Sequence, residues 1–165
     1  MKEKYIFREI EKEEVPQMFS MILQRMEWMD KKGIEQWNVT NYEEIYPESY
    51  YEEKRQKGEV FVLADRLTKE IVSAAVLKEE DTRWPDEASA IYVHNFVSRI
   101  EEKGAGSAFL RCAEEYAVQK GKKYFRRDSS VDNDPLAQYY TKHGFKEVGR
   151  CEEGLYKGIL RQKEL

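Results

Sequence analysis

Residues that often reveal a protein's chemistry are scarce in this chain. Its 165 residues include only 2 cysteines, 2 histidines, 4 prolines and 9 glycines. Cys112 and Cys151 lie far apart, and no histidine stands at metal-ligand spacing from either, so we expect reduced thiols and no metal site. Neither cysteine has a neighbouring base in the sequence, which argues against a nucleophilic thiol.

Long apolar runs and an excess of one charge are also missing. No stretch approaches the roughly 18 apolar residues of a membrane span, and the N-terminus leads into a strand-like run instead of an apolar signal core. The 28 basic and 32 acidic side chains are mixed along the chain and leave a net charge of -4. Because nucleic-acid backbones require a basic field, we expect no nucleic acid as partner. The missing apolar run and signal core lead us to expect no membrane partner and a cytoplasmic protein.

The composition nevertheless supports a folded core. Hydrophobic residues make up 41% and aromatic residues 13% of the chain. No repeat, low-complexity tract or flexible linker divides it. A chain of this length fits one core, so we predict a single domain spanning residues 1–165.

Hydrophobic periodicity predicts an α/β fold of the α+β type, with a sheet that mixes parallel and antiparallel strands. The predicted strands cover residues 5–10, 60–64, 71–77, 90–97, 123–128, 145–151 and 155–160. The predicted helices cover residues 15–32, 107–120 and 134–140, with mixed helix and loop over 36–55. The helix at 107–120 joins two strands that should be parallel, because such a crossover rarely joins antiparallel neighbours. The other strands should form a mostly antiparallel sheet that closes with a C-terminal hairpin.

A glycine turn lies between the predicted strand at 90–97 and the helix that follows. Gly104 and Gly106 let backbone N–H groups converge on an anion, and the start of a helix adds its positive dipole end. This pattern is neither a P-loop nor a dinucleotide fingerprint. Taken alone, it is equally compatible with a tight turn that binds nothing.

A second motif, further along the chain, indicates what the glycine turn binds. Asn133, Tyr140 and Gly144-Phe145 follow one another at a spacing that, with Gly104-Ala105-Gly106, resembles the GNAT family, the GCN5-related N-acetyltransferases. The segments 34–37 and 92–94 also look like those of uncharacterised bacterial members. The resemblance covers nearly the whole chain and implies an N-acetyltransferase that uses acetyl-CoA as cosubstrate.

The resemblance also implies which residues bind the cosubstrate. The main chain of two strand residues would contact the pantetheine arm, the glycine turn would hold the pyrophosphate, and an asparagine would cap a helix or contact the cosubstrate. These residues are Phe96, Val97, Lys103, Gly104, Ala105, Gly106, Ser107 and Asn133. The chain departs from the family at Glu101, where Arg or Gln is usual, so Lys103 or Arg99 would have to supply the missing positive charge.

Two side chains are candidates for proton transfer in a direct attack of an amine on the thioester. The resemblance makes Tyr140 the acid that protonates the leaving thiolate, the alternative being a buried core tyrosine. His94 should share one strand face with Tyr92 and Phe96, and a histidine suits proton abstraction near neutral pH. A purely structural histidine remains the alternative, with Asp128 or a water relay as competing bases.

The acceptor side is less well defined by the sequence. We predict that Trp37, Tyr42, Trp84 and Asp128 contact the acceptor, with Tyr46, Glu43 and Glu44 beside them to receive a small cationic amine. The alternative is that these aromatics only pack their segments onto the sheet.

Other functions on the same fold stay open at this stage. A non-catalytic acyl-CoA sensing module would also explain the motifs, and a protein N-acetyltransferase would differ only in its acceptor. Exposed hairpin edges in such folds often pair, so a homodimer is a further expectation.

Overall fold

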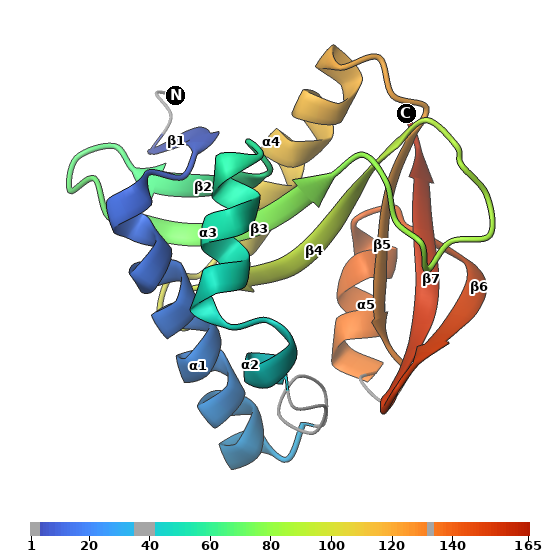
Figure 1. The fold of residues 1–165 in the computed structure, drawn as a ribbon, viewed down its shortest axis with the longest axis horizontal. Helices are drawn as coiled ribbons and strands as arrows, with labels where there is room; N and C mark the ends of the chain where they lie inside the picture. Colours follow the sequence, from blue (N-terminus) through green and yellow to red (C-terminus); the bar gives the residue numbers. More distant parts are fainter. Residues whose placement is uncertain (1–3, 35–41, 132–133) are drawn as a thin grey trace.

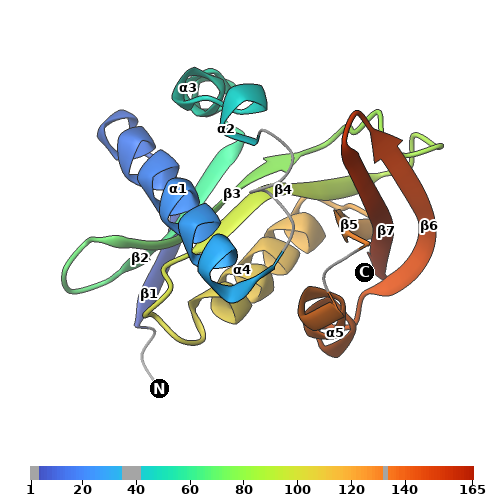
Figure 2. The ribbon, with the colours of Figure 1, turned by 90° about the horizontal axis from the view of Figure 1, so that it is seen from below.

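A single seven-stranded sheet with helices on both faces forms the protein (Figures 1 and 2). The computed structural model describes residues 4–34, 42–131 and 134–165. The strands are β1 (Tyr5–Glu9), β2 (Val60–Asp65), β3 (Ile71–Lys78), β4 (Ala90–Ser98), β5 (Tyr124–Ser130), β6 (Lys146–Glu153) and β7 (Tyr156–Glu164). The helices are the 3-10 turn η1 (Lys12–Glu14), α1 (Val15–Lys32), α2 (Tyr42–Ile45), α3 (Glu48–Gln56), α4 (Ala105–Gln119) and α5 (Asp134–Lys142).

The strand order is β1-β2-β3-β4-β5-β7-β6, and within the described ranges only the β4–β5 pair is parallel. The predicted fold class is therefore confirmed, including the crossover through α4 and the closing hairpin. The hairpin strands are longer than predicted, and β7 lies between β5 and β6. Helix α4 begins two residues earlier than predicted, because Gly104 adopts a left-handed conformation (φ 84°) and ends the preceding turn there.

Two apolar layers hold the helices to the sheet. Helices α1 and α3 pack on one face and α4 on the other, as Figure 2 shows. Met18 and Ile22 of α1 belong to the first core cluster, whereas Phe109 and Ala113 of α4 belong to the second. None of the helices in the described part of the chain is long and apolar enough to cross a membrane.

Strands β4 and β5 separate along their length. Their pairing runs from Ala90↔Tyr124 to Val93↔Arg127, after which the two strands diverge (Figure 1). The cause lies in β4, where Asn95 and Phe96 together face the single residue Ala75 of β3, between the pairs Ala74↔Val97 and Val76↔His94. Such a bulge bends and twists its strand.

Asn95 fixes this bulge in place. Its φ of 55° is left-handed, a conformation that asparagine tolerates better than most residues. Its buried amide donates to the hydroxyl of Tyr42 and accepts from that of Tyr50 at 3.2 Å. The bulge is thus tied to α2 and α3, which lie above it.

The bulge overturns one prediction about β4. Simple alternation placed Tyr92, His94 and Phe96 on one face, but the extra residue reverses the facing after position 95. Phe96 packs in the α4 core beside Phe109, at 5.5 Å between ring centroids, whereas Tyr92 packs in a separate cluster with Trp84. The side chains of His94 and Phe96 therefore lie on opposite faces of β4.

Replacing Asn95 should destabilise the fold in a way that depends on the backbone. Asn95→Val should lower the free energy of unfolding by about 2–4 kcal/mol, because a β-branched residue is strained at positive φ and both hydrogen bonds are lost. Asn95→Gly should lower it by only about 1–2 kcal/mol, because glycine adopts this φ freely. Urea denaturation measures both values, and equal losses would contradict a left-handed bulge.

Candidate active site

Two cavities lie where β4 and β5 separate, and Arg127 lines both of them. The first has a volume of about 380 Å³ and the second about 370 Å³. The first is bounded by α1, the end of β4, the start of α4 and α5, and the second by α2, the middle of β4, β5 and the β6–β7 turn. The site therefore has one cavity on each side of a buried arginine, which allows one reactant in each.

The glycine turn forms one end of the first cavity. Gly104, Gly106 and Ser107 line it at the N-terminus of α4, where backbone N–H groups have no intrahelical acceptor. A Cβ on Gly106 would lie 3.0 Å from both Ser98 Oγ and Tyr139 Oη, so any larger residue would crowd this end. The glycine turn thus presents backbone N–H groups to the cavity, as anion binding at a helix N-terminus requires. Lys103 and Ala105 do not line the cavity among the described residues, and Ala105 is fully buried.

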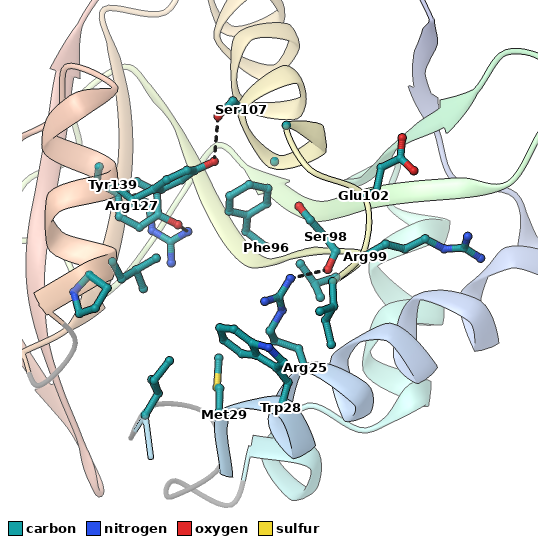
Figure 3. Close-up of a pocket in the computed structure, with 18 residues that line it drawn as sticks. Arg25, Trp28, Met29, Phe96, Ser98, Arg99, Glu102, Ser107, Arg127 and Tyr139 are labelled. Atoms are coloured by element: carbon teal, nitrogen blue, oxygen red, sulfur yellow. Dashed lines mark hydrogen bonds between the residues drawn. The ribbon is translucent and has the colours of Figure 1, made fainter. Parts of the chain in front are cut away.

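Positive charge reaches the first cavity from α1. Arg25 extends across to the carbonyl of Ser98, to which its Nη2 donates at 2.8 Å (Figure 3). Burial lowers the pKa of Arg25, and the nearby Glu101 opposes that shift. Arg99 also lines the cavity, but its guanidinium turns away and pairs with Glu70 at 3.6 Å. Arg25 is thus better placed than Arg99 to offset Glu101.

The carboxylate that lines the first cavity belongs to Glu102. It accepts hydrogen bonds from Lys4 Nζ at 3.1 Å and from the Tyr5 hydroxyl at 2.6 Å. These hydrogen bonds, that from Tyr5 above all, lower the pKa of Glu102. Its charge is therefore directed toward β1 and largely offset there, which leaves the cavity suited to an anion.

A hydrogen-bonded set of side chains joins α4 to α5 beside the cavity. His143 Nδ1 donates to the carbonyl of Tyr139 at 2.8 Å, so in the neutral ring Nε2 accepts from Ser107 Oγ at 3.0 Å. The Tyr139 hydroxyl lies 3.5 Å from the same Oγ (Figure 3). His143 thus positions Ser107.

Tyr140 lies at the inner end of the first cavity and is only 1% exposed. Its hydroxyl accepts a hydrogen bond of 2.5 Å from Arg127 Nη1. Burial raises its pKa to about 12, and the positive charge of Arg127 limits the rise. A phenol in this position stays protonated at neutral pH and is a potential proton donor to a bound ligand.

His94 lines the second cavity and is paired with Asp81 behind it. His94 is 9% exposed, and its Nε2 lies 2.8 Å from Asp81 Oδ2. The other oxygen of Asp81 accepts from the backbone N–H of Arg83 at 2.9 Å. Burial alone would raise the pKa of Asp81, but the His94 hydrogen bond and charge hold it below its usual value. The ionised carboxylate keeps the proton of neutral His94 on Nε2, and Nδ1 is then the basic nitrogen.

Asp128 is held by a separate set of donors in the same cavity. Its Oδ2 accepts from the Tyr156 hydroxyl at 2.5 Å and lies 3.3 Å from Arg83 Nη1. Arg83 also donates to Glu153 at 3.0 Å and to the Tyr46 hydroxyl at 3.1 Å. Burial alone would lower the pKa of Arg83, but these acidic neighbours, Asp128 first, raise it.

Asp81, His94 and Asp128 bring one ligand atom each within 4.8 Å of one another, close enough to hold a metal ion. The chemistry of the surroundings argues for a different use. Each carboxylate already accepts from protein donors, and the Arg83 guanidinium would repel a cation next to Asp128. The group is better described as two carboxylates that position a histidine and an arginine.

The structure brings most of the predicted residues together, though not all. Tyr42 and Asp128 line the second cavity with His94, and Glu44 and Tyr46 do so too, whereas Glu43 is not among the described lining residues. Phe96 and Val97 line the first cavity with Tyr140. Trp84 lies outside both cavities, packed with Tyr92 and over the Arg126 guanidinium at 4.2 Å. Trp37 and Asn133 lie outside the described residues.

Four functional candidates were missed from the sequence. Arg25 comes from α1, Asp81 and Arg83 come from the loop before β4, and Arg127 comes from β5. None belongs to a motif or to a recognisable spacing. Only the fold places them beside residues that the motifs identify.

The two thiols play no part in either cavity. Neither is disulfide-bonded, and neither lines a cavity described above. Burial raises the pKa of both Cys112 and Cys151, the latter to about 11. They therefore stay protonated near neutral pH, as expected for thiols without a nucleophilic role.

Comparison with known proteins identifies a family for this chain. Residues 24–145 match the model of the acetyltransferase (GNAT) family. The chain is 26% identical over 161 residues to an uncharacterised N-acetyltransferase, YesJ, of Bacillus subtilis, covering 93% of this chain and 86% of that protein.

Solved structures share the fold at low sequence identity. A GNAT-family acetyltransferase from Listeria monocytogenes superposes with a TM-score of 0.79 at 19% identity, covering 98% of this chain and 95% of that one. The PaiA N-acetyltransferase of Thermoplasma acidophilum, solved in complex with coenzyme A, gives a TM-score of 0.75 at 14% identity, covering 99% and 100%.

The Arg83–Asp128 pair should be needed for stability. Both side chains are buried, at 15% and 7% exposure, so Arg83→Met leaves an uncompensated carboxylate and should lower the free energy of unfolding by about 3–5 kcal/mol. Lys31→Met breaks an exposed pair with Glu27 and should change it by no more than the measurement error. Urea denaturation of both variants, and of Arg83→Met with Asp128→Asn, checks this. A double variant no more stable than Arg83→Met would contradict it.

Proposed function

This chain belongs to the GNAT family of acetyltransferases, and we propose that it transfers an acetyl group from acetyl-CoA to the primary amine of a small molecule. The observation that carries the proposal is the pair of cavities that meet at Arg127 where β4 and β5 separate. One cavity has the chemistry of a donor site and the other that of an acceptor site. Direct attack across this boundary requires both reactants to be bound together.

Acetyl-CoA fits the first cavity as the donor. Its pyrophosphate would lie on the N–H groups of Gly106 and Ser107, and Arg25, which lines the same cavity, would supply positive charge. A side chain at position 106 would crowd Ser98 and Tyr139, so glycine keeps this end of the cavity clear. The pantetheine arm would run along the main chain of Phe96 and Val97, in the opening that the bulge creates. Bound there, acetyl-CoA supplies the activated acetyl group.

Tyr140 is suited to protonate the sulfur when the carbon–sulfur bond breaks. It lies at the inner end of the donor cavity, remains protonated at neutral pH and is oriented by Arg127. Such proton transfer prevents a free thiolate from attacking the product and reversing the reaction.

The Asp81–His94 pair is suited to take the proton from the attacking amine. Asp81 fixes the ring tautomer, and His94 lines the acceptor cavity on the strand that also borders the donor cavity. A neutral histidine oriented by a buried carboxylate is an effective base near neutral pH.

The acceptor cavity favours a small amine with an apolar part. Tyr42 and Tyr46 form one wall, with ring centroids 4.8 Å apart, and Tyr156 lies on the opposite hairpin. Ile45 and Leu155, 58% and 71% exposed, border the opening. A volume of about 370 Å³ suits a small molecule. The two free thiols fit a reducing compartment, and we propose that the enzyme acts in the cytoplasm.

Thiol release from acetyl-CoA in the presence of a panel of small primary amines tests the proposal. Tyr140→Phe should lower kcat about 100-fold, because it removes the acid, while the Kd for CoA changes less than about threefold. Tyr116→Phe removes a tyrosine hydroxyl on α4 outside both cavities and should leave both values unchanged.

Two outcomes would redirect the assignment. CoA binding without turnover on any amine would indicate a sensing module. Turnover only on peptide or protein amines would indicate a protein N-acetyltransferase.

The pH dependence of kcat/KM tests the proposed base. In the wild type we expect a loss of activity toward acidic pH, because a protonated imidazole cannot accept the amine proton. His94→Gln should remove this acidic limb and lower kcat/KM about 100-fold, and Asp81→Asn should lower it at least about tenfold, because the tautomer is no longer fixed. An unchanged acidic limb in His94→Gln would assign the base elsewhere, with Asp128 the next candidate.

A further inference from the structure

Arg127 carries a buried charge that pairs with no carboxylate among the described residues. It is 6% exposed, and its side chain donates to the Asp128 carbonyl at 2.8 Å and to Tyr140 Oη at 2.5 Å. In the described part of the chain, no carboxylate oxygen lies within 4.0 Å of its guanidinium nitrogens. The buried Arg126 and Arg83, by contrast, pair with Asp86 and Asp128.

A second cation lies directly across from it. Arg161 of β7 is the cross-strand partner of Arg127 and is 3% exposed, and its Nε donates to Ser129 Oγ at 2.8 Å. It too has no carboxylate within 4.0 Å among the described residues, although its cross-strand neighbour Glu147 on β6 partly offsets its charge from a greater distance. Like charges facing each other in a sheet are unfavourable, and so is an unpaired buried charge. This excess of positive charge lies beneath Tyr140, at the boundary of the two cavities.

The hydrogen bond to Tyr140 has a direction that matters. Arginine has donors and no acceptor, so in this bond the phenol oxygen of Tyr140 must be the acceptor. The phenol proton is left free, and the Tyr140 hydroxyl donates to no residue in the described structure. Because Tyr140 lines the donor cavity, a bound ligand there is the acceptor available to that proton.

Arg127 also acts on the charge that proton transfer creates. Burial opposes the ionisation of Tyr140, as do the neighbouring Tyr139 and Asp128, whereas Arg127 and Arg161 favour it. The Arg127 guanidinium also lies over the Tyr140 ring, 4.5 Å from its centroid. A phenolate formed at Oη would therefore meet a guanidinium in a site shielded from water.

We propose that Arg127 is the positioning residue of the leaving-group acid, which directs the Tyr140 proton toward the thioester sulfur and stabilises the phenolate that remains. The proposal rests on the proposed acetyl transfer. The amine nitrogen bonds to the acetyl carbon, the carbon–sulfur bond breaks with its electrons on sulfur, and the Tyr140 proton moves to that sulfur. His94 holds the proton lost by the amine, and Tyr140 regains a proton as the products leave.

A double-mutant cycle tests whether Arg127 acts through Tyr140. Arg127→Met should lower kcat about 10- to 100-fold with little change in the Kd for CoA. In a Tyr140→Phe background the same change should lower kcat by less than about twofold, because the group it serves is already gone. A merely structural role would slow both backgrounds equally and would overturn the proposal.

Two further variants separate charge from folding. Arg127→Lys keeps the positive charge but loses the planar guanidinium with its rigid set of N–H donors. Its kcat should therefore lie between those of wild type and Arg127→Met. Arg126→Met removes a neighbouring buried arginine on β5 that lines neither cavity and should leave kcat unchanged once the variant is shown to be folded. If Arg127→Met does not fold, Arg127→Lys in both Tyr140 backgrounds provides the same cycle, and equal slowing in both overturns the proposal.

A spectroscopic measurement needs no turnover. The ultraviolet absorbance of the thiolate of bound CoA, followed against pH, should give a thiol pKa lower in the wild type than in Arg127→Met, because the guanidinium favours negative charge at the sulfur. Burial raises the pKa of the protein's own Cys112 and Cys151 thiols, and subtracting the spectrum of the CoA-free protein at each pH removes the absorbance of ionised tyrosines. Equal thiol pKa values in the two proteins would overturn the proposal.

Failure of the proposed function would look different. The wild type would then release no thiol with any amine, whatever residue stands at position 127. Failure of the present inference alone would leave an active wild type in which Arg127→Met behaves like Arg126→Met.

Discussion

The separation of β4 from β5 is the constraint on which the rest of this structure depends. Two parallel strands that remained paired would leave no room for a substrate between them. One extra residue in β4, held at Asn95 by a left-handed backbone and by hydrogen bonds to α2 and from α3, turns the strand away after Val93. The helices that cover one face of the sheet thus maintain the opening that the chemistry requires.

The opening also explains why the protein tolerates so much buried charge. Arg83, Arg127, Asp81 and Asp128 would each destabilise an ordinary core. Here three of them are stabilised by hydrogen bonds or ion pairs in or beside the second cavity, and Arg127 is held at the boundary with no carboxylate partner among the described residues. We interpret this uneven distribution as functional, because in the proposed reaction the donor side would stabilise negative charge on sulfur while the acceptor side would accept a proton.

Much of the architecture could be predicted from local patterns. The apolar periodicity of α1 and α4 and the strands of the central sheet were correctly located, because helices and strands expose their period directly in the sequence. The α4 crossover made the β4–β5 pair parallel by topology alone. The bulge escaped prediction, since one extra residue leaves no signal in the pattern of apolar side chains, and the facing of Phe96 was therefore wrong.

By itself the sequence determined the fold and the family resemblance, and it identified Gly104, Gly106 and Tyr140 as candidates, because each depends on a motif or a periodicity within one segment. Only the tertiary structure decided which charged side chains lie at or beside the two cavities. Arg25, Asp81 and Arg127 come from separate elements and reach the cavities through the packing of α1, the loop before β4, and β5. Electrostatic interactions of this kind depend on distance and burial in three dimensions, and neither can be read from spacing along the chain.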